Sequence, residues 1–134
     1  MANILIAEDE DALRHLVSRA LRLDGHEVSA AEDGEEALER LQEADGEFDL
    51  VLSDIRMPGL TGIELAHAIA QRWPHVKVLL MTGYAEQKEA AEDLATIIEG
   101  VLDKPFAIGD VRRQVCEIVA AAASQAPGRR SACA

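Results

Sequence analysis

Residues 48–61 read FDLVLSDIRMPGLT, and this segment carries one carboxylate, that of Asp54, into a turn. The apolar run at residues 50–52 is too short for a helix and does not alternate with polar residues. It therefore predicts a strand buried on both faces of a parallel sheet. Pro58 lacks a backbone N–H and Gly59 tolerates a positive φ, so the chain is expected to turn soon after Asp54. Asp54 is thus placed at the carboxyl end of a strand, the edge at which open α/β sheets bind ligands.

The size and composition of the chain indicate one globular domain. A chain of 134 residues with 49% hydrophobic and 28% charged residues has enough apolar side chains for a core. We expect this domain to cover residues 1–123. Residues 124–134 are rich in Ala, Pro, Gly and Arg and are expected to form a frayed tail.

The charge and hydropathy of the chain exclude some partners. Its net charge of −12 argues against nucleic acid, whose phosphates are bound mainly by Lys and Arg. No apolar run approaches the roughly 20 residues of a membrane-spanning helix, and the first residues do not resemble a secretion signal. We therefore expect a cytoplasmic protein without a membrane partner.

Five apolar runs predict five strands. They lie at residues 3–7, 26–30, 50–54, 76–81 and 96–102. The run at 26–30 is the most polar, so that strand is expected at an edge of the sheet.

Amphipathic segments that alternate with these runs predict five helices. Thr61 followed by Glu64 predicts an N-cap and capping box for the third helix. The fourth helix, at about residues 86–95, has the poorest apolar stripe. The stripes of the other helices comprise Leu13, Leu16, Val17, Ala20 and Leu21; Ala37, Leu38 and Leu41; Leu65, Ala66, Ile69 and Ala70; and Val111, Val115, Ile118 and Val119.

This alternation predicts an α/β fold. Right-handed crossovers place helices on both faces of a doubly wound, five-stranded parallel sheet with strand order 2-1-3-4-5. In that order, Glu8 and Asp9 leave the first strand, Asp54 the third, Thr82 the fourth and Lys104 the fifth. All five side chains are therefore expected at one edge of the sheet. Glu10 and Asp11 also follow the first strand, but acids in a first helical turn usually serve as caps.

These motifs together resemble the receiver domains of bacterial two-component response regulators. The resemblance covers about residues 3–121. The motifs that carry it are Glu8-Asp9, Asp54 with Met57-Pro58-Gly59 and Gly62, Thr82-Gly83, and Lys104-Pro105-Phe106.

The resemblance implies a role for each member of the site. Asp54 would accept a phosphoryl group from a histidine kinase or phosphotransfer protein. Glu8 and Asp9 would hold Mg²⁺ together with Asp54 and the backbone carbonyl of Arg56. Thr82 would bond a phosphoryl oxygen, Lys104 would pair with the phosphate, and the Lys104-Pro105 peptide would be cis. Such a domain assists only its own phosphorylation and dephosphorylation and is not an enzyme acting on other substrates.

The chemistry of these side chains agrees with those roles. Three crowded carboxylates repel one another unless a cation lies among them, and hard oxygen ligands suit Mg²⁺. A cation and Lys104 would neutralise charge on a transferring phosphoryl group while the Asp54 carboxylate attacks it. Taken singly, Thr82 could instead be a strand-end cap and Lys104 a solvated surface amine.

Two positions depart from the family pattern. Three residues before Lys104 the family usually has Tyr or Phe, whose ring turns inward on phosphorylation; this chain has Val101. Tyr84 is the nearest aromatic residue in sequence and could perform a related function or could simply cover the site. Arg56 occupies the position whose side chain commonly influences the access of water to the phosphorylated aspartate.

The expected output is binding to a separate protein. In the family the response surface comprises the fourth helix, the fifth strand and the fifth helix. Residues 81–85 and the missing aromatic also resemble the stand-alone receivers of α-proteobacteria that prime a Clp-type protease for regulated degradation. The competing outputs are a motility target, an intermediate phosphorelay carrier and a phosphate sink.

An enzyme of another class has a similar nucleophile. Mg²⁺-dependent phosphatases of the haloacid dehalogenase type also use an Asp at a strand end. They require a second Asp two residues later as acid and base, and Arg56 occupies that position here. Turnover on a small phosphomonoester is therefore the less favoured alternative.

Overall fold

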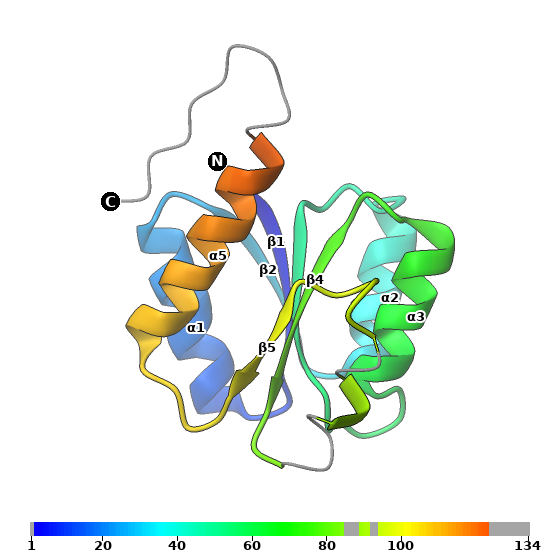
Figure 1. Cartoon of the computed structure of the whole chain (residues 1–134), viewed down its shortest axis with the longest axis horizontal. Helices are drawn as coiled ribbons and strands as arrows, with labels where there is room; N and C mark the ends of the chain where they lie inside the picture. The colour runs from blue at the N-terminus through cyan, green and yellow to red at the C-terminus, as the bar shows by residue number, and fades with distance from the viewer. Residues whose placement is uncertain (1, 85–88, 92–93, 124–134) are drawn as a thin grey trace.

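Five parallel strands form one sheet in the computed structural model, which describes residues 2–84, 89–91 and 94–123. Their spatial order is β2-β1-β3-β4-β5, so the predicted fold class and strand order are confirmed (Figure 1). The bounds are β1 (Asn3–Ala7), β2 (Glu27–Ala31), β3 (Leu50–Asp54), β4 (Lys77–Thr82) and β5 (Gly100–Asp103). The second and fourth strands each start one residue later than predicted.

Helices cover both faces of this sheet. On one face lie α1 (Asp11–Leu23) and α5 (Ile108–Ala123), and on the other lie α2 (Gly34–Glu43) and α3 (Gly62–Arg72) (Figure 1). Successive strand residues alternate between the two layers. In β1, Ile4 and Ile6 join the cluster under α1 and α5, whereas Leu5 and Ala7 join the cluster under α2 and α3. A strand with both faces covered must be apolar throughout, which explains the uninterrupted runs in the sequence.

The edge strand β2 is more polar than the central strands. Glu27 is exposed and residues 28–30 are half-buried, whereas every residue of the central strand β3 is buried. The predicted edge position is therefore confirmed.

The last strand begins later than predicted. It starts at Gly100, not at residue 96, because the preceding segment forms hydrogen-bonded turns. The amides of Ile97 and Ile98 both donate to the carbonyl oxygen of Leu94. Both isoleucine side chains pack on the core beneath α2 and α3. The apolar β-branched run thus reflects burial of a turn rather than pairing in the sheet.

Two predicted segments lie mostly outside the described residues. Of the helix predicted at about residues 86–95, residues 89–91 are described and are helical, and Ala91 is buried. The predicted tail at residues 124–134 lies outside the described part of the chain.

The buried face of α1 differs from the predicted apolar stripe. Leu16 is 54% exposed, whereas Arg14 and Ser18 are buried beside Val17 and Leu21. The face that meets the sheet is therefore rotated from the predicted one, and it includes one charged side chain. Apolar periodicity located the helix but did not give its orientation.

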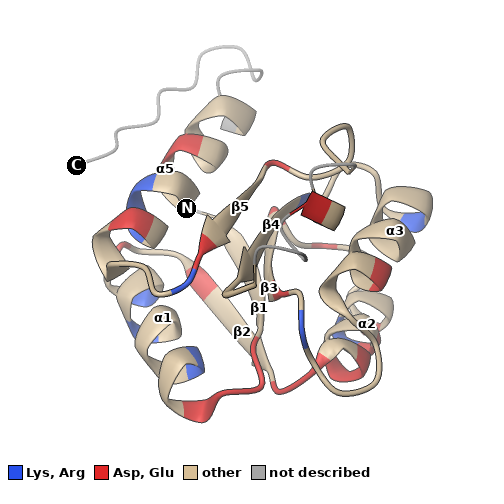
Figure 2. Cartoon of the chain, turned by 60° about the horizontal axis from the view of Figure 1, so that its bottom comes forward, with Lys and Arg blue, Asp and Glu red and all other residues tan. Residues whose placement is uncertain are grey.

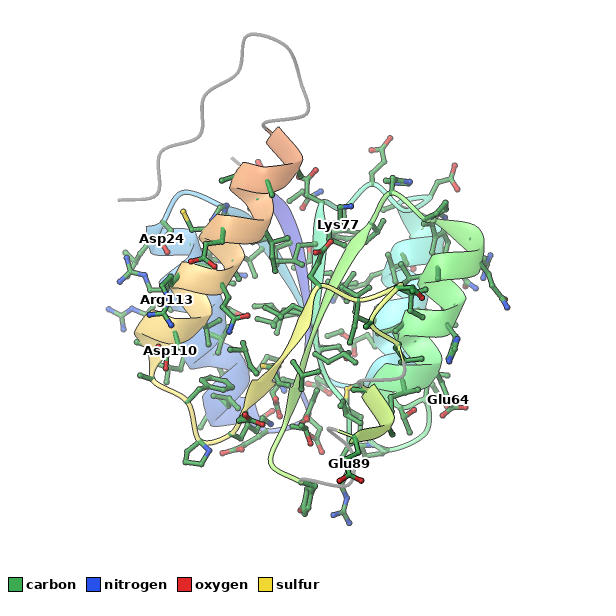
Figure 3. All side chains as sticks on the ribbon, viewed as in Figure 1. Asp24, Glu64, Lys77, Glu89, Asp110 and Arg113 are labelled. Carbon is green, nitrogen blue, oxygen red and sulfur yellow. The ribbon has the colours of Figure 1, made fainter. Side chains whose placement is uncertain are left out.

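The first turn of α3 carries the predicted capping box. The Thr61 hydroxyl accepts a hydrogen bond from the Glu64 amide at 3.2 Å, and the Glu64 carboxylate accepts one from the Thr61 amide at 3.0 Å. Figure 3 shows Glu64 at this end of the helix. Two of the amides that a helix N-terminus leaves without intrahelical partners are thereby satisfied.

The carboxyl ends of the strands meet at one edge of the molecule. Figure 2 turns this edge toward the reader, and segments of Asp and Glu gather along it. Among the described residues, no helix is both long enough and apolar enough to span a bilayer.

Replacing Thr61 with Ala is expected to lower the free energy of unfolding by about 1 kcal/mol, because one capping hydrogen bond to the amide of Glu64 is lost. Urea unfolding measures the change. Thr96→Ala, at an exposed turn position, is the matched control and should be close to neutral. Equal destabilisation by the two substitutions would contradict the capping role.

Candidate functional site

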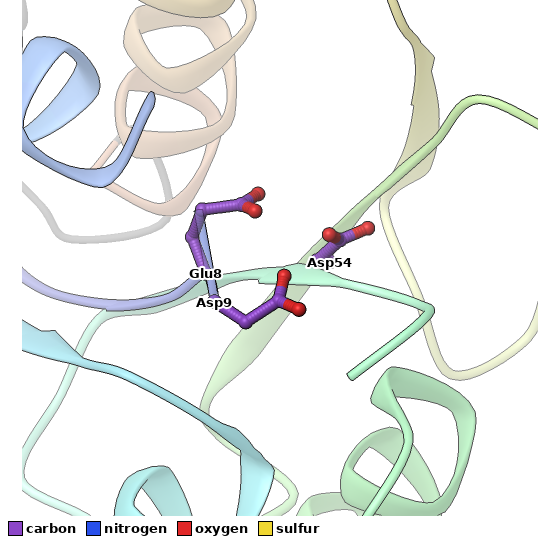
Figure 4. A group of neighbouring side chains, drawn as sticks. All are labelled: Glu8, Asp9 and Asp54. Carbon is purple, nitrogen blue, oxygen red and sulfur yellow. The ribbon is translucent and has the colours of Figure 1, made fainter. Parts of the chain in front are cut away.

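Three carboxylates converge where β1 and β3 end. Glu8 and Asp9 directly follow β1, and Asp54 is the last residue of β3. These strands are neighbours, with Ala7 opposite Ser53, so both chains leave the sheet side by side. The carboxylates of Glu8, Asp9 and Asp54 each offer an oxygen within 4.8 Å of the others (Figure 4). Glu8 and Asp54 are buried and Asp9 is exposed.

Lys104 lies beside two of these carboxylates. Its Nζ donates to Glu8 Oε2 and to Asp54 Oδ2, each at 2.9 Å. The backbone of Lys104 is held at the same place, because its amide donates to the carbonyl oxygen of Thr82 at 2.7 Å. The Lys104-Pro105 peptide is cis, as the resemblance implied. One ammonium group thus bridges the ends of β1 and β3 from the end of β5.

Burial and a neighbouring carboxylate alter the protonation of Glu8. Burial raises the pKa of Glu8 from 4.5 to about 7; the nearby charge of Asp54 adds to this, and the hydrogen bond from Lys104 opposes it. Burial also disfavours the charged form of Lys104, but its hydrogen bonds to Asp54 and Glu8 prevail and hold the pKa of Lys104 above its usual 10.5. At neutral pH the lysine is therefore charged, while Glu8 is close to its own titration midpoint.

The loop after Asp54 is held by a close approach of two backbones. The amide of Gly62 donates to the carbonyl oxygen of Ile55 at 2.9 Å. A Cβ at position 62 would lie 2.3 Å from the carbonyl oxygen of Asp54, so only glycine fits there. Gly59 has φ = +74°, which confirms the turn expected from Pro58-Gly59. The start of α3 thus packs directly beneath the residue that carries the central carboxylate.

A hollow of about 760 Å³ opens above the carboxylates. It is lined by Glu8, Asp9, Glu10, Asp54, Arg56, Met57, Pro58, Gly83, Tyr84 and Lys104. Across its mouth the guanidinium carbon of Arg56 lies 5.1 Å from the centre of the Tyr84 ring. This cation–π contact joins the loop after β3 to the loop after β4.

The Thr82 hydroxyl does not line this hollow. Thr82 ends β4 at the predicted edge, but it is buried and its side chain turns toward the following backbone. Its Oγ1 accepts a hydrogen bond from the Tyr84 amide at 3.1 Å and lies 3.4 Å from the Tyr84 carbonyl oxygen. The sequence predicted the position of this residue but not the direction of its side chain.

Two features of the site were not anticipated from the sequence. The first is the stacking of Arg56 on Tyr84, for which the sequence carries no signal. The second is buried Arg14, which contacts the backbone of Glu8. The available signal for Arg14 was its place on the helical face shared by Val17 and Leu21. Val101, which stands where the family has an aromatic ring, is half-buried and packs on the core beneath α2 and α3.

The site therefore places a carboxylate, that of Asp54, beside a group that can neutralise negative charge, the ammonium of Lys104. A carboxylate at a strand end can form a covalent bond to phosphorus, and an adjacent ammonium can stabilise the charge that develops. Three carboxylates with an open side are also a donor set suited to Mg²⁺, which keeps some of its water ligands.

The strand order, the acidic cluster and the lysine beside it are those of a receiver domain. The sequence profile described as the response regulator receiver domain matches residues 4–116, and the chain belongs to this family. Receiver domains are signalling domains that accept phosphoryl groups with Mg²⁺ at the acidic site; they are not enzymes with turnover on external substrates.

Relatives extend this comparison. The chain is 36% identical over 122 residues to the response regulator receiver protein CpdR of Brucella abortus, covering 91% of this chain and 100% of that protein. It is 38% identical over 118 residues to the sensor kinase CckA of the same organism, covering 88% of this chain but 12% of the kinase. The chain thus spans a small part of some curated relatives, and it likewise spans 22% of the response regulator FleR of Pseudomonas aeruginosa.

A solved structure shows the same fold. The response regulator TrrA of Thermotoga maritima, in complex with Mg²⁺ and BeF, matches with a TM-score of 0.77 at 32% identity. The match covers 88% of this chain and 99% of TrrA.

Without Mg²⁺, the stability of the fold is expected to fall as the pH rises from about 4.5 through 7. The pKa of Glu8 is higher in the folded than in the unfolded chain, so the folded state binds the proton more tightly, and this contribution is lost as Glu8 ionises. The slope should be on the order of 1 kcal/mol per pH unit. Urea unfolding in the presence of a chelator measures it.

Glu8→Gln is the control for this slope. Burial lowers the pKa of His26 below its usual 6.5, so this residue acts in the opposite sense while the pH rises toward 6.5, where the unfolded chain still binds the proton that the folded chain has released. The difference between wild type and Glu8→Gln therefore isolates the contribution of Glu8. Parallel pH profiles for the two proteins would contradict the assignment.

Proposed function

We propose that this receiver domain accepts a phosphoryl group on Asp54 and signals through phosphorylation-dependent binding to another protein. The observation that carries the proposal is the placement of Asp54 beside Lys104, at 2.9 Å, and within 4.8 Å of Glu8 and Asp9, under an open hollow. The proposed domain covers residues 1–123, with residues 124–134 as its tail.

In the proposed reaction an Asp54 carboxylate oxygen attacks the phosphorus of a phosphohistidine. A P–O bond forms and the P–N bond breaks, and the imidazole leaves with the electron pair of that bond. Lys104 already contacts Asp54, so its ammonium can move with the new phosphoryl oxygens and neutralise them. The phosphodonor would be a histidine kinase or a histidine phosphotransfer protein.

The oxygen donors at this edge support Mg²⁺ as the cofactor. Glu8, Asp9 and Asp54 would supply carboxylate oxygens and Arg56 its backbone carbonyl. When bound, the ion would neutralise charge on the transferring phosphoryl group. A cation would favour the ionised carboxylates, because burial, with a smaller contribution from the charge of Asp54, raises the pKa of Glu8. Further support is that the similar protein TrrA was solved with Mg²⁺ and BeF.

We propose that the output is a separate protein bound at the family's response surface, which comprises β5, α5 and the predicted fourth helix, of which residues 89–91 are described as helical. The chain is similar to the receiver protein CpdR over the full length of that protein. The resemblance of residues 81–85 to stand-alone receivers that prime a Clp-type protease favours control of regulated proteolysis. A phosphorelay intermediate or phosphate sink is the alternative, supported by the similarity to a segment of CckA. Protein partners in the cytoplasm, rather than nucleic acid, agree with the net charge of −12.

Asp54 is expected to be the one residue that acquires a stable acyl phosphate. After incubation with acetyl phosphate and Mg²⁺, intact-mass measurement should show one added phosphoryl group, which is lost in Asp54→Asn. Asp103→Asn removes an exposed carboxylate from the neighbouring end of β5 and should retain full labelling. Labelling of Asp54→Asn at the wild-type level would refute the assignment.

Phosphorylation is expected to alter the loop after β4. New phosphoryl oxygens would draw the Thr82 hydroxyl away from the Tyr84 backbone, since a charge-assisted hydrogen bond is roughly twice as strong as a neutral one. Because Val101 has no ring to fill the vacated space, the rearrangement should involve Tyr84 and the helical residues 89–91.

Amide hydrogen exchange with and without beryllofluoride measures this rearrangement. Faster or slower exchange should appear at Gly83, Tyr84 and residues 89–91. The change should disappear in Thr82→Ala, which cannot form the new bond. Changes confined to the surroundings of Val101 would show that the signal takes another route.

A further inference from the structure

A buried arginine lies directly behind the acid pair. Arg14, on α1, is 7% exposed, and its Nη1 donates to the backbone carbonyl oxygen of Glu8 at 3.1 Å. Its Nη2 donates to the Asp11 carboxylate at 2.5 Å and lies 3.9 Å from the Glu32 carboxylate. A buried guanidinium is costly unless its charge is paired and its N–H groups are bonded, and these contacts meet both conditions.

The carbonyl that Arg14 holds belongs to the peptide joining Glu8 to Asp9. Because that peptide is planar, a hydrogen bond that fixes its carbonyl also fixes the orientation of the whole peptide group, to which the Cα atoms of Glu8 and Asp9 are both attached. The backbone that follows β1 is also held by the Glu8 amide, which donates to the Ala31 carbonyl at 3.2 Å. The Glu10 amide donates in turn to the Glu8 carboxylate at 3.1 Å. Arg14 therefore fixes the one backbone group between the two acids.

We propose that Arg14 is a positioning residue for the cation site: by holding the Glu8–Asp9 peptide, it keeps both carboxylates directed toward Asp54. This inference rests on the proposed function, because it assumes that a divalent cation binds there. Arginine suits the task because its planar fork places two nitrogens on two different acceptors at fixed angles, which a lysine cannot do.

Stability alone is a weaker explanation for this residue. The carboxylates of Asp11 and Glu32 are 77% and 71% exposed, so their pairing with Arg14 is screened by water. Buried ion pairs also generally stabilise a fold no better than apolar side chains of similar volume. What Arg14 supplies beyond an apolar residue is the directed hydrogen bond to Glu8.

The test compares the Mg²⁺ affinity of the unphosphorylated full chain with that of Arg14→Lys and Arg14→Met. Titration calorimetry should show a dissociation constant about tenfold higher in both variants, the usual effect of removing a group that orients a metal ligand. The matched control is Arg22→Lys on the same helix, whose Nη2 donates to the Val28 carbonyl at 3.0 Å at an exposed position. Its Mg²⁺ affinity should equal that of wild type.

A second readout separates positioning from chemistry. With acetyl phosphate as donor, the Mg²⁺ concentration for half-maximal labelling should rise by the same factor in the Arg14 variants. The rate at saturating Mg²⁺ should stay near that of wild type, because Arg14 touches no reacting atom. Unchanged Mg²⁺ affinity together with a lowered melting temperature would assign Arg14 a purely structural role and overturn the proposal.

The affinity measurement needs no phosphodonor, so the two proposals can fail separately. Wild type that binds Mg²⁺ but is never labelled on Asp54 would refute the proposed function and leave the role of Arg14 standing. Wild type that binds no Mg²⁺ would overturn the role of Arg14.

Wild-type protein also gives a test that does not depend on the folding of the variants. If the Arg14–Glu8 hydrogen bond favours Mg²⁺ binding, then Mg²⁺ binding must favour that hydrogen bond by the same free energy. Exchange of the Arg14 guanidinium protons with solvent, measured by NMR, should therefore slow when Mg²⁺ is added. Exchange that is indifferent to Mg²⁺ would overturn the proposal.

Discussion

Repulsion among three carboxylates at the end of a parallel sheet is the constraint on which the site depends. Glu8, Asp9 and Asp54 come within 4.8 Å of one another, and two of them are buried. One ammonium, that of Lys104, contacts two of the three at 2.9 Å. The charge balance remains negative, and the pKa of Glu8 is raised by burial and, to a smaller extent, by the charge of Asp54. A site with this imbalance gains free energy from any additional cation, which is the physical basis for proposing Mg²⁺.

The backbone around the site allows little adjustment of these charges. Gly62 brings α3 against the carbonyl of Asp54, and Arg14 holds the carbonyl of Glu8. Each of the two strand ends is therefore fixed by a contact from a helix that follows it. Preorganised charges interact more strongly with a bound ion or phosphoryl group than mobile ones, since no reorganisation is required.

The opposite side of the hollow is held by weaker contacts, which break more easily. Tyr84 is 52% exposed, and it is held by the Thr82 hydroxyl and by stacking under Arg56. Such contacts are individually worth about 1 kcal/mol or less at exposed positions. A new negative charge on Asp54 would compete for both the hydroxyl and the guanidinium. The site thus combines a rigidly held cluster of carboxylates with a loop after β4 that can rearrange when the charge on Asp54 changes.

The sequence by itself determined the fold class, the strand order and the edge at which the site lies. Strands covered on both faces need continuous apolar runs, and the residues that follow those runs must meet at one edge; hence Glu8, Asp9, Asp54, Thr82 and Lys104 could be located from their positions alone. Apolar patterning reports burial rather than backbone geometry, so the run at residues 96–98 was mistaken for the start of β5.

Only the tertiary structure decided where side chains point. The Thr82 hydroxyl turns to the Tyr84 backbone, Arg56 stacks on the Tyr84 ring, and Arg14 is buried behind Glu8. Each of these contacts joins residues from different loops or elements. Their formation depends on the rotation of a helix or the path of a loop, which local periodicity does not specify.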